Sequence, residues 1–317
     1  MDQSKLDTEL AKALIDFPVL DIWDDIPAVR ALGDEMAGQV QLDKGQTEGV
    51  TTSDHLIAGP EGAPEVSVRV YRPKDGDESL PALLWMHGGG YVLGSLQGDD
   101  SLVRCLVDQV RCIVVSVDYR LAPECPFPAP LEDCYAALSW LAAHTGVLGV
   151  DPTRIAIGGL SAGGGLAAGL AILARDRATV NVMFQMLLCP MIDDRNITAS
   201  SHAITDPRLW NRDNNERGWA AYLGDLHDTK SIPAFAAVSR AENLSNLPPA
   251  YIPVGSLDLF LDENIEYAKR LNKAGVPTEL HVFPGGFHAF EFIVPTARVS
   301  KLAMTMHYEK LRAAFRL

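Results

Sequence analysis

The chain has 317 residues, 47% of them hydrophobic, which is enough to bury the core of one large domain or of a domain with an appendage. Its 41 acidic side chains outnumber its 27 basic ones, giving a formal net charge of -14. This acidity argues against nucleic acid and anionic membranes as partners, because both attract basic surfaces.

The sequence carries no signal for export, membrane insertion or disulfide formation. Residues from Met1 to Asp7 are polar and acidic, unlike a signal peptide, and no run of about 18 apolar residues predicts a membrane span. The five cysteines are an odd number and lack C-x-x-C spacing, which favours free thiols in a reducing compartment and no zinc site. We therefore expect a soluble cytoplasmic protein.

From about residue 50 the chain alternates strand and helix patterns. The expected strands are residues 51–57, 66–71, 82–86, 112–117, 155–157, 182–188, 251–254 and 278–283. Between them, apolar residues recur at helical spacing, as in residues 102–110, 131–141 and 265–271. Strands joined by crossover helices predict an α/β fold with a mostly parallel, doubly wound sheet of about eight strands flanked by helices.

Two segments interrupt this alternation. Residues 1–45 carry helical patterns before the sheet begins, and residues 191–248 are far longer than a strand-to-helix crossover requires. We interpret them as the N-terminal part and the insertion of a helical cap over the C-terminal edge of the sheet, where open α/β folds place their sites. Residues 46–190 and 249–317 would then form the catalytic domain. The alternative is two helical decorations packed on the side of the sheet.

The pentapeptide from Gly159 to Gly163 fits G-x-S-x-G, with Ser161 at its centre. A short apolar strand precedes it and a small-residue helix pattern follows it, which is the context of a nucleophile elbow. Glycines two residues before and after the serine allow strand and helix to pass closely. Ser161 is therefore the candidate nucleophile.

A serine nucleophile needs a base, and the base needs an acid that orients it. In this kind of fold the order along the chain is Ser, acid, His. Asp258 follows the strand at 251–254, and His288 follows the strand at 278–283 in a glycine-rich loop. These two residues are the candidate acid and base. The other seven histidines lack such a setting, and Asp262 and Glu263 fall in the expected first turn of a helix, a structural place.

An oxyanion hole supplies backbone N–H groups to the tetrahedral intermediate. One donor is expected from Ala162, the residue after the nucleophile. Others are expected from His87-Gly88-Gly89-Gly90, directly after the strand at 82–86, where glycines leave the backbone bare. A phosphate-binding loop is the alternative, but no Lys-Ser/Thr pair follows.

The sequence resembles the hormone-sensitive-lipase-like carboxylesterases, the bacterial family IV esterases. Five motifs carry the resemblance, in the family's order over residues 65–292: His87 to Tyr91, Asp118 to Glu124, Ser161 to Gly164, Asp258 to Glu263 and Gly286 to Phe290. The resemblance implies an α/β-hydrolase fold with a helical cap and hydrolysis of short- to medium-chain acyl esters without a cofactor. It implies that Gly89 and Gly90 join Ala162 as oxyanion donors. It also implies an Arg120–Glu124 clamp near the site.

Two residues depart from the family pattern. Leu160 stands before the nucleophile, where the family usually has Asp or Thr, and Gly165 stands where it often has Asn. A leucine offers no local hydrogen bonds, so we expect packing to support the elbow. Our hypothesis is that Leu160 affects stability or substrate preference more than the chemistry.

Other functions use the same scaffold. A non-catalytic ligand receptor would lack a working triad histidine, whereas His288 is present, and a peptidase or amidase would need features that the sequence does not identify. A purely structural role gives no reason for an assembled triad. The natural ester stays open, and so does the assembly state, although family members often form homodimers through a sheet edge.

Overall fold

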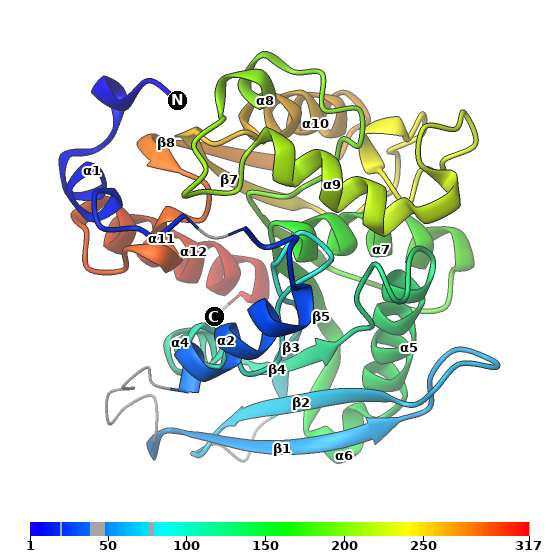
Figure 1. The fold of residues 1–317 in the computed structure, drawn as a ribbon. Coiled ribbons are helices and arrows are strands. Elements are labelled where there is room, and N and C mark those ends of the chain that lie inside the picture. Colours follow the sequence, from blue (N-terminus) through cyan, green and yellow to red (C-terminus); the bar gives the residue numbers. More distant parts are fainter. Residues whose placement is uncertain (20, 39–47, 76–78, 317) are drawn as a thin grey trace.

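The computed structural model describes residues 1–19, 21–38, 48–75 and 79–316. Its centre is one eight-stranded sheet with the order β1-β2-β4-β3-β5-β6-β7-β8 (Figure 1). The strands are β1 Val50–Ile57, β2 Val66–Pro73, β3 Leu80–Met86, β4 Ile113–Asp118, β5 Val150–Leu160, β6 Phe184–Leu188, β7 Ala250–Leu257 and β8 Thr278–Phe287. β1, β2 and β4 pair antiparallel, and every other neighbouring pair is parallel, which confirms the expected mostly parallel sheet.

Helices cover both faces of this sheet. They are α1 Thr8–Leu14, α2 Ile26–Gly38, α4 Asp100–Val110, α5 Ala129–Ala143, α6 Thr145–Leu148, α7 Ala162–Arg177, α8 Ala199–Ala203, α9 Arg212–Leu223, α10 Leu261–Lys273, α11 Phe290–Ile293 and α12 Arg298–Phe315. Along β3, Leu84 and Met86 join the core under α5 and α7, whereas Leu83 and Trp85 join the core under α4 and α12. A strand buried on both faces explains the continuous apolar run in this part of the sequence.

The two segments outside the sheet alternation contact each other. In the N-terminal segment, the indole Nε1 of Trp23 lies 2.9 Å from Oδ1 of Asn214 on α9. The guanidinium of Arg208 in the insertion donates to the carbonyl of Leu14, at 2.8 Å. Figure 1 shows α8 of the insertion beside α10, and these two helices contact each other. Residues 39–45 of the expected N-terminal cap segment lie outside the described residues.

Helix α1 packs against β8, the edge strand of the sheet. Leu10 and Leu14 are buried in a cluster with aromatic side chains of β8 and α11. The amide of Asp7 donates to the carbonyl of Gly285 at 3.1 Å, and Gly285 has a φ of 75°. A Cβ on Gly285 would lie 2.4 Å from the Asp7 nitrogen, so this close approach requires glycine. The N-terminal segment thereby packs against the strand that leads to His288.

Candidate active site

Ser161 sits in a tight turn between β5 and α7. Its φ of 56° and ψ of -117° are rare for a residue with a side chain and cost about 1–3 kcal/mol. Hydrogen bonds hold it there: its N–H donates to the carbonyl of Leu188 at 2.8 Å, and its own carbonyl accepts from Gly165 and Met191, both at 3.0 Å. The expected elbow is present, and the surrounding backbone maintains its strained conformation.

The glycines of the G-x-S-x-G motif are required by close backbone contacts. A Cβ on Gly159 would lie 2.4 Å from the carbonyl carbon of Gly163. A Cβ on Gly163 would lie 2.1 Å from the carbonyl oxygen of Met86 and 2.3 Å from that of His87. The bare backbone therefore brings α7 directly against the end of β3, and the glycine loop that follows β3 begins beside the serine elbow.

The three triad candidates form a hydrogen-bonded row. Nε2 of His288 lies 2.9 Å from Oγ of Ser161, and its Nδ1 lies 2.8 Å from Oδ2 of Asp258. The amide of Phe260 donates to the other oxygen of Asp258 at 2.9 Å. Asp258 is 1% exposed, Ser161 5% and His288 7%. The carboxylate is thus shielded from water, and the imidazole is oriented with one nitrogen toward the hydroxyl.

Strand β8 is longer than the sequence pattern predicted. It continues to Phe287 after a register shift: Gly255 of β7 lies opposite Phe283, and Leu257 lies opposite Phe287. Asp258 and His288 therefore directly follow two paired strand ends. This register places the carboxylate and the imidazole side by side.

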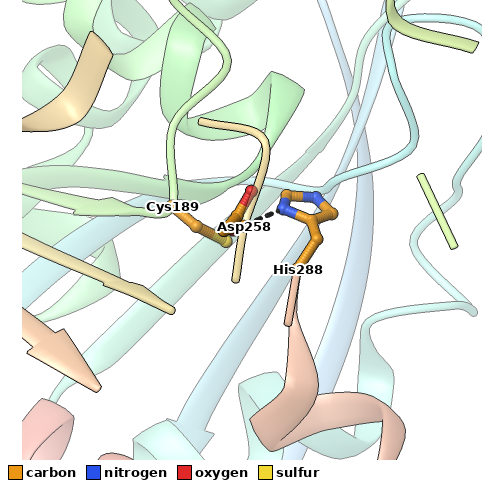
Figure 2. Close-up of side chains that lie close together, drawn as sticks. All are labelled: Cys189, Asp258 and His288. Carbon is orange, nitrogen blue, oxygen red and sulfur yellow. Dashed lines mark hydrogen bonds and ion pairs between the residues drawn. The ribbon is translucent and has the colours of Figure 1, made fainter. Parts of the chain in front are cut away.

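Cys189 lies against this row, beside Asp258 in Figure 2. Within the described parts of the chain, Cys189, Asp258 and His288 are a group whose potential metal ligand atoms all lie within 4.8 Å of one another. Burial, followed by the nearby Asp258 carboxylate, raises the pKa of the Cys189 thiol well above its usual value. The thiol is therefore kept neutral, and neutral sulfur is a poor metal ligand. The hydrogen bond between Asp258 and His288 also occupies the other two ligand atoms.

Among the described residues, nothing accepts a hydrogen bond from the amides of the predicted oxyanion donors. Gly89 and Gly90 have φ values of 120° and 61°, and their N–H groups donate to no other described residue. Ala162 is the first residue of α7, so its N–H has no partner within the helix. Polar N–H groups at a buried site require a partner, which a negatively charged oxygen would provide.

The indole of Trp210, in the insertion, packs on Gly90. A Cβ on Gly90 would lie 1.9 Å from Cη2 of this ring. Trp210 is one of four aromatic residues in residues 191–248, and nothing in the local sequence pattern distinguishes it from the other three. The structure places it against a predicted oxyanion donor.

The structure shows what surrounds Leu160 and Gly165, the two residues that depart from the family pattern. Leu160 is 9% exposed, and a Cβ on Gly88 would lie 3.4 Å from its Cγ, so the leucine packs against the oxyanion loop. At Gly165, a Cβ would lie 2.2 Å from the carbonyl oxygen of Met191 and 2.4 Å from the hydroxyl of Tyr91. Glycine at 165 therefore leaves room for the Tyr91–Met191 hydrogen bond of 2.9 Å.

The prediction of an Arg120–Glu124 clamp is wrong. Arg120 instead contacts Asp133 on α5, with N–O distances of 2.7 and 2.8 Å. The Asp133 side chain is fully buried and requires a charged partner, which Arg120 supplies. Glu124 pairs with Arg30 of α2 through two N–O contacts of 2.9 Å. No sequence signal marked Arg30, which also donates to the carbonyls of Val92 and Ala122, both at 2.8 Å.

Comparisons with known proteins agree with this geometry. Residues 83–292 match the family described as alpha/beta hydrolase fold. The chain is 39% identical over 254 residues to esterase LipI of Mycobacterium tuberculosis, covering 77% of each chain. The solved structure of a bacterial heroin esterase aligns over 100% of both chains, with a TM-score of 0.94 and 41% identity. That of esterase LipW from Mycobacterium marinum aligns over 100% of this chain and 98% of its own, with a TM-score of 0.87 and 34% identity. The chain therefore belongs to the alpha/beta hydrolase fold family, within its hormone-sensitive-lipase-like branch.

Proposed function

We propose that this protein, a carboxylic ester hydrolase, works through an acyl-enzyme intermediate on Ser161. The observation that carries the proposal is the position of His288, 2.9 Å from the Ser161 hydroxyl and 2.8 Å from the buried Asp258 carboxylate. An imidazole held between a hydroxyl and a carboxylate can take the hydroxyl proton and be stabilised as imidazolium.

In the first half of the reaction, Oγ of Ser161 attacks the ester carbonyl carbon while Nε2 of His288 takes its proton. The C–O bond of the tetrahedral intermediate then breaks, and His288 returns the proton to the departing alcohol. In the second half, water attacks the acyl carbonyl with His288 as base, and the acid leaves. Asp258 keeps Nδ1 protonated throughout, which directs the basic Nε2 at the reacting oxygen.

The negative charge of the intermediate needs N–H donors, and we assign Gly89, Gly90 and Ala162 to this role. Their unpartnered amides and the contact of α7 with the end of β3 support the assignment. Each such donor is worth roughly 3 kcal/mol of the barrier. No metal or organic cofactor takes part in these steps.

We further propose that residues 1–45 and 191–248 form one cap over the site. The Trp23–Asn214 and Arg208–Leu14 hydrogen bonds and the packing of Trp210 on Gly90 support this division. An aromatic side chain at the oxyanion loop favours an apolar acyl pocket. Short- to medium-chain acyl esters are the proposed substrates.

The test is turnover of p-nitrophenyl esters from acetate to palmitate by the wild type and by Ser161→Ala. We expect the highest kcat/KM for the shorter chains. The Ala variant should lose activity about 10⁴-fold or more, because removal of a triad member leaves only oxyanion and binding contributions. Equal activity in the Ala variant would refute the mechanism, and a maximum at palmitate would refute the chain-length assignment.

The alternative functions find no support, because the three relatives named above are all esterases. Among the described residues, no helix combines the length and the apolar character needed to cross a bilayer. A cytoplasmic location and a homodimer through the sheet edge remain predictions. Light scattering of the purified protein in solution tests the second.

A further inference from the structure

Residues 188–193, here called the bridging segment, run from the end of β6 into the insertion and bracket the nucleophile. The carbonyl of Leu188 accepts the Ser161 N–H at 2.8 Å, and the N–H of Met191 donates to the Ser161 carbonyl at 3.0 Å. The carbonyl of Met191 in turn accepts from the hydroxyl of Tyr91, directly after the oxyanion glycines, at 2.9 Å. The bridging segment therefore holds both peptide groups of the strained serine.

The first turn of α10 holds the other side of the bridging segment. Oε1 of Glu263 accepts from the amides of Ile192 and Asp193, at 2.9 and 3.2 Å. The side-chain amide of the next residue, Asn264, donates to the carbonyl of Pro190 at 2.8 Å. These three bonds attach α10 to the same short segment that holds Ser161.

Asp258, the acid of the triad, lies three residues before the start of α10. The amide of Leu261, the first residue of α10, donates to the carbonyl of Asp258 at 3.2 Å, and that of Phe260 donates to its carboxylate at 2.9 Å. Figure 2 shows Cys189 of the bridging segment next to Asp258. One side of the segment is thus hydrogen-bonded to the nucleophile, and the other is attached to the helix that directly follows the acid.

Glu263 is an unusual residue for such a place. It is 3% exposed, and its Oε2 has no hydrogen-bond partner among the described residues. Burial raises the pKa of its carboxyl group well above the usual value, with Asp193 and Asp258 adding to the shift. A buried carboxyl group with one unsatisfied oxygen costs free energy, so its presence in the core requires an explanation. Its neutral form still offers Oε1 as an acceptor.

We infer that Glu263 is a positioning residue that, through the bridging segment, fixes the separation between Ser161 and Asp258. This inference rests on the proposed triad. His288 must reach both partners at once, at 2.9 and 2.8 Å, so a shift of either end breaks one of its two bonds. Misplacement of a reacting group by about 1 Å can cost around 10²-fold in rate.

The experiment compares Glu263→Ala, Glu263→Gln and Glu266→Ala with the wild type. Glu266 is the matched control, because it lies on the same helix with a 57% exposed side chain whose one partner within the described part of the chain is Lys269. We would measure kcat and KM for p-nitrophenyl acetate, with kcat expressed per active site titrated by a phosphonate ester. Melting temperatures would be recorded in parallel.

For Glu263→Ala we expect a fall in kcat of about 10- to 100-fold with KM changed less than about threefold, because substrate contacts are untouched. Glu263→Gln should keep kcat within about threefold of the wild type, since its carbonyl oxygen accepts the same two N–H groups. Glu266→Ala should behave as the wild type.

Two results would overturn the inference. One is a wild-type kcat per titrated site in Glu263→Ala, even with a lower melting temperature, which would show a purely structural role. The other is a Gln variant as slow as the Ala variant. If Glu263→Ala does not fold, Asn264→Ala takes its place. Within the described residues its side chain bonds only to the carbonyl of Pro190, so a lowered kcat supports the inference and an unchanged kcat opposes it. Ser161→Ala, assayed alongside, separates the two proposals, because its activity bears on the triad alone.

Discussion

Gly90 is the residue at which the oxyanion loop and the insertion meet. Its φ of 61° strains any residue with a side chain by about 1–2 kcal/mol, and the Trp210 ring fills the space of a Cβ. Gly90 therefore serves two purposes: it turns the backbone so that its amide is free, and it admits the indole.

We predict that Gly90→Ala lowers kcat about 100-fold, because the displaced amide no longer stabilises the intermediate, and destabilises the fold by at least about 1–2 kcal/mol. Steady-state kinetics and urea unfolding measure the two effects. Gly98→Ala is the control, since its Cβ would find only ordinary contacts, the nearest at 3.5 Å.

The double variant Gly90→Ala/Trp210→Ala separates the two causes of destabilisation, which are backbone strain and the clash with the indole. Removing the indole relieves the clash but not the backbone strain, so it should recover part of the stability that the single Gly90 variant loses, after correction for Trp210→Ala alone. No recovery would mean that the ring does not limit the space at Gly90.

At the scale of elements, α2 is attached to the rest of the molecule by a cluster of polar contacts around Arg30. It has no buried residue, and Arg30 connects it to the loops after β3 and β4 through Val92, Ala122 and Glu124. A guanidinium matches this set because it presents several N–H groups in a rigid fork, which a lysine cannot reproduce.

We predict that Arg30→Ala and Arg30→Lys both accelerate amide hydrogen exchange in α2 by about tenfold, which corresponds to a loss of about 1–2 kcal/mol in local stability. Hydrogen–deuterium exchange followed by mass spectrometry reports this helix separately from the sheet. Lys269→Ala, which removes an exposed ion pair on α10, should leave α2 unchanged. Unaltered exchange in α2 of the Arg30 variants would contradict the role assigned to Arg30.

The elements that carry the site could be predicted because their signals are local. Ser161 lies in a five-residue motif between a strand and a helix, and Asp258 and His288 each follow a strand. The partners of charged residues could not be predicted, because they are chosen by packing between distant segments. Glu124 pairs with Arg30, 94 positions away, and its neighbour in the motif, Arg120, pairs with Asp133. The position of Glu263 in the first turn of a helix could be predicted from the sequence, but its burial could not, because burial depends on packing against a distant segment.

At the scale of the whole molecule, buried His87 couples stability to pH. Burial lowers the pKa of this imidazole from 6.5 to about 4, against opposing effects of the Gly88 carbonyl and of Asp34. The side chain is 1% exposed, its Nδ1 lies 2.8 Å from the Gly88 carbonyl, and its Nε2 has no partner among the described residues. The folded protein therefore keeps this histidine neutral.

The unfolded chain binds the proton more readily than the folded one. Above pH 6.5, His87 therefore does not lower the free energy of unfolding, and as the pH falls toward 4 it lowers this free energy increasingly. We predict that the free energy of unfolding of the wild type, relative to His87→Asn, falls by about 2–3 kcal/mol between pH 7.5 and 4.5. Urea unfolding at several pH values measures this difference.

Asp99, with a pKa raised to about 6 by burial, titrates in the same range with the opposite sign. It is present in both proteins, so its effect cancels in the comparison. Parallel stability curves for the wild type and His87→Asn would contradict the prediction.

The contact between α1 and the strand before His288 has a consequence for synthesis of the protein. Asp7 bonds to Gly285, and Glu9 accepts the amide of Arg298, so partners nearly the whole described chain apart must meet. Ribosomes add about 5–20 residues per second, so on the order of tens of seconds pass between the synthesis of α1 and the synthesis of the surface that buries it. During that interval Leu10 and Leu14 are exposed to other apolar surfaces in the cell. The nascent chain therefore completes its catalytic centre only after residue 288 has been translated, 127 positions after the serine of the elbow.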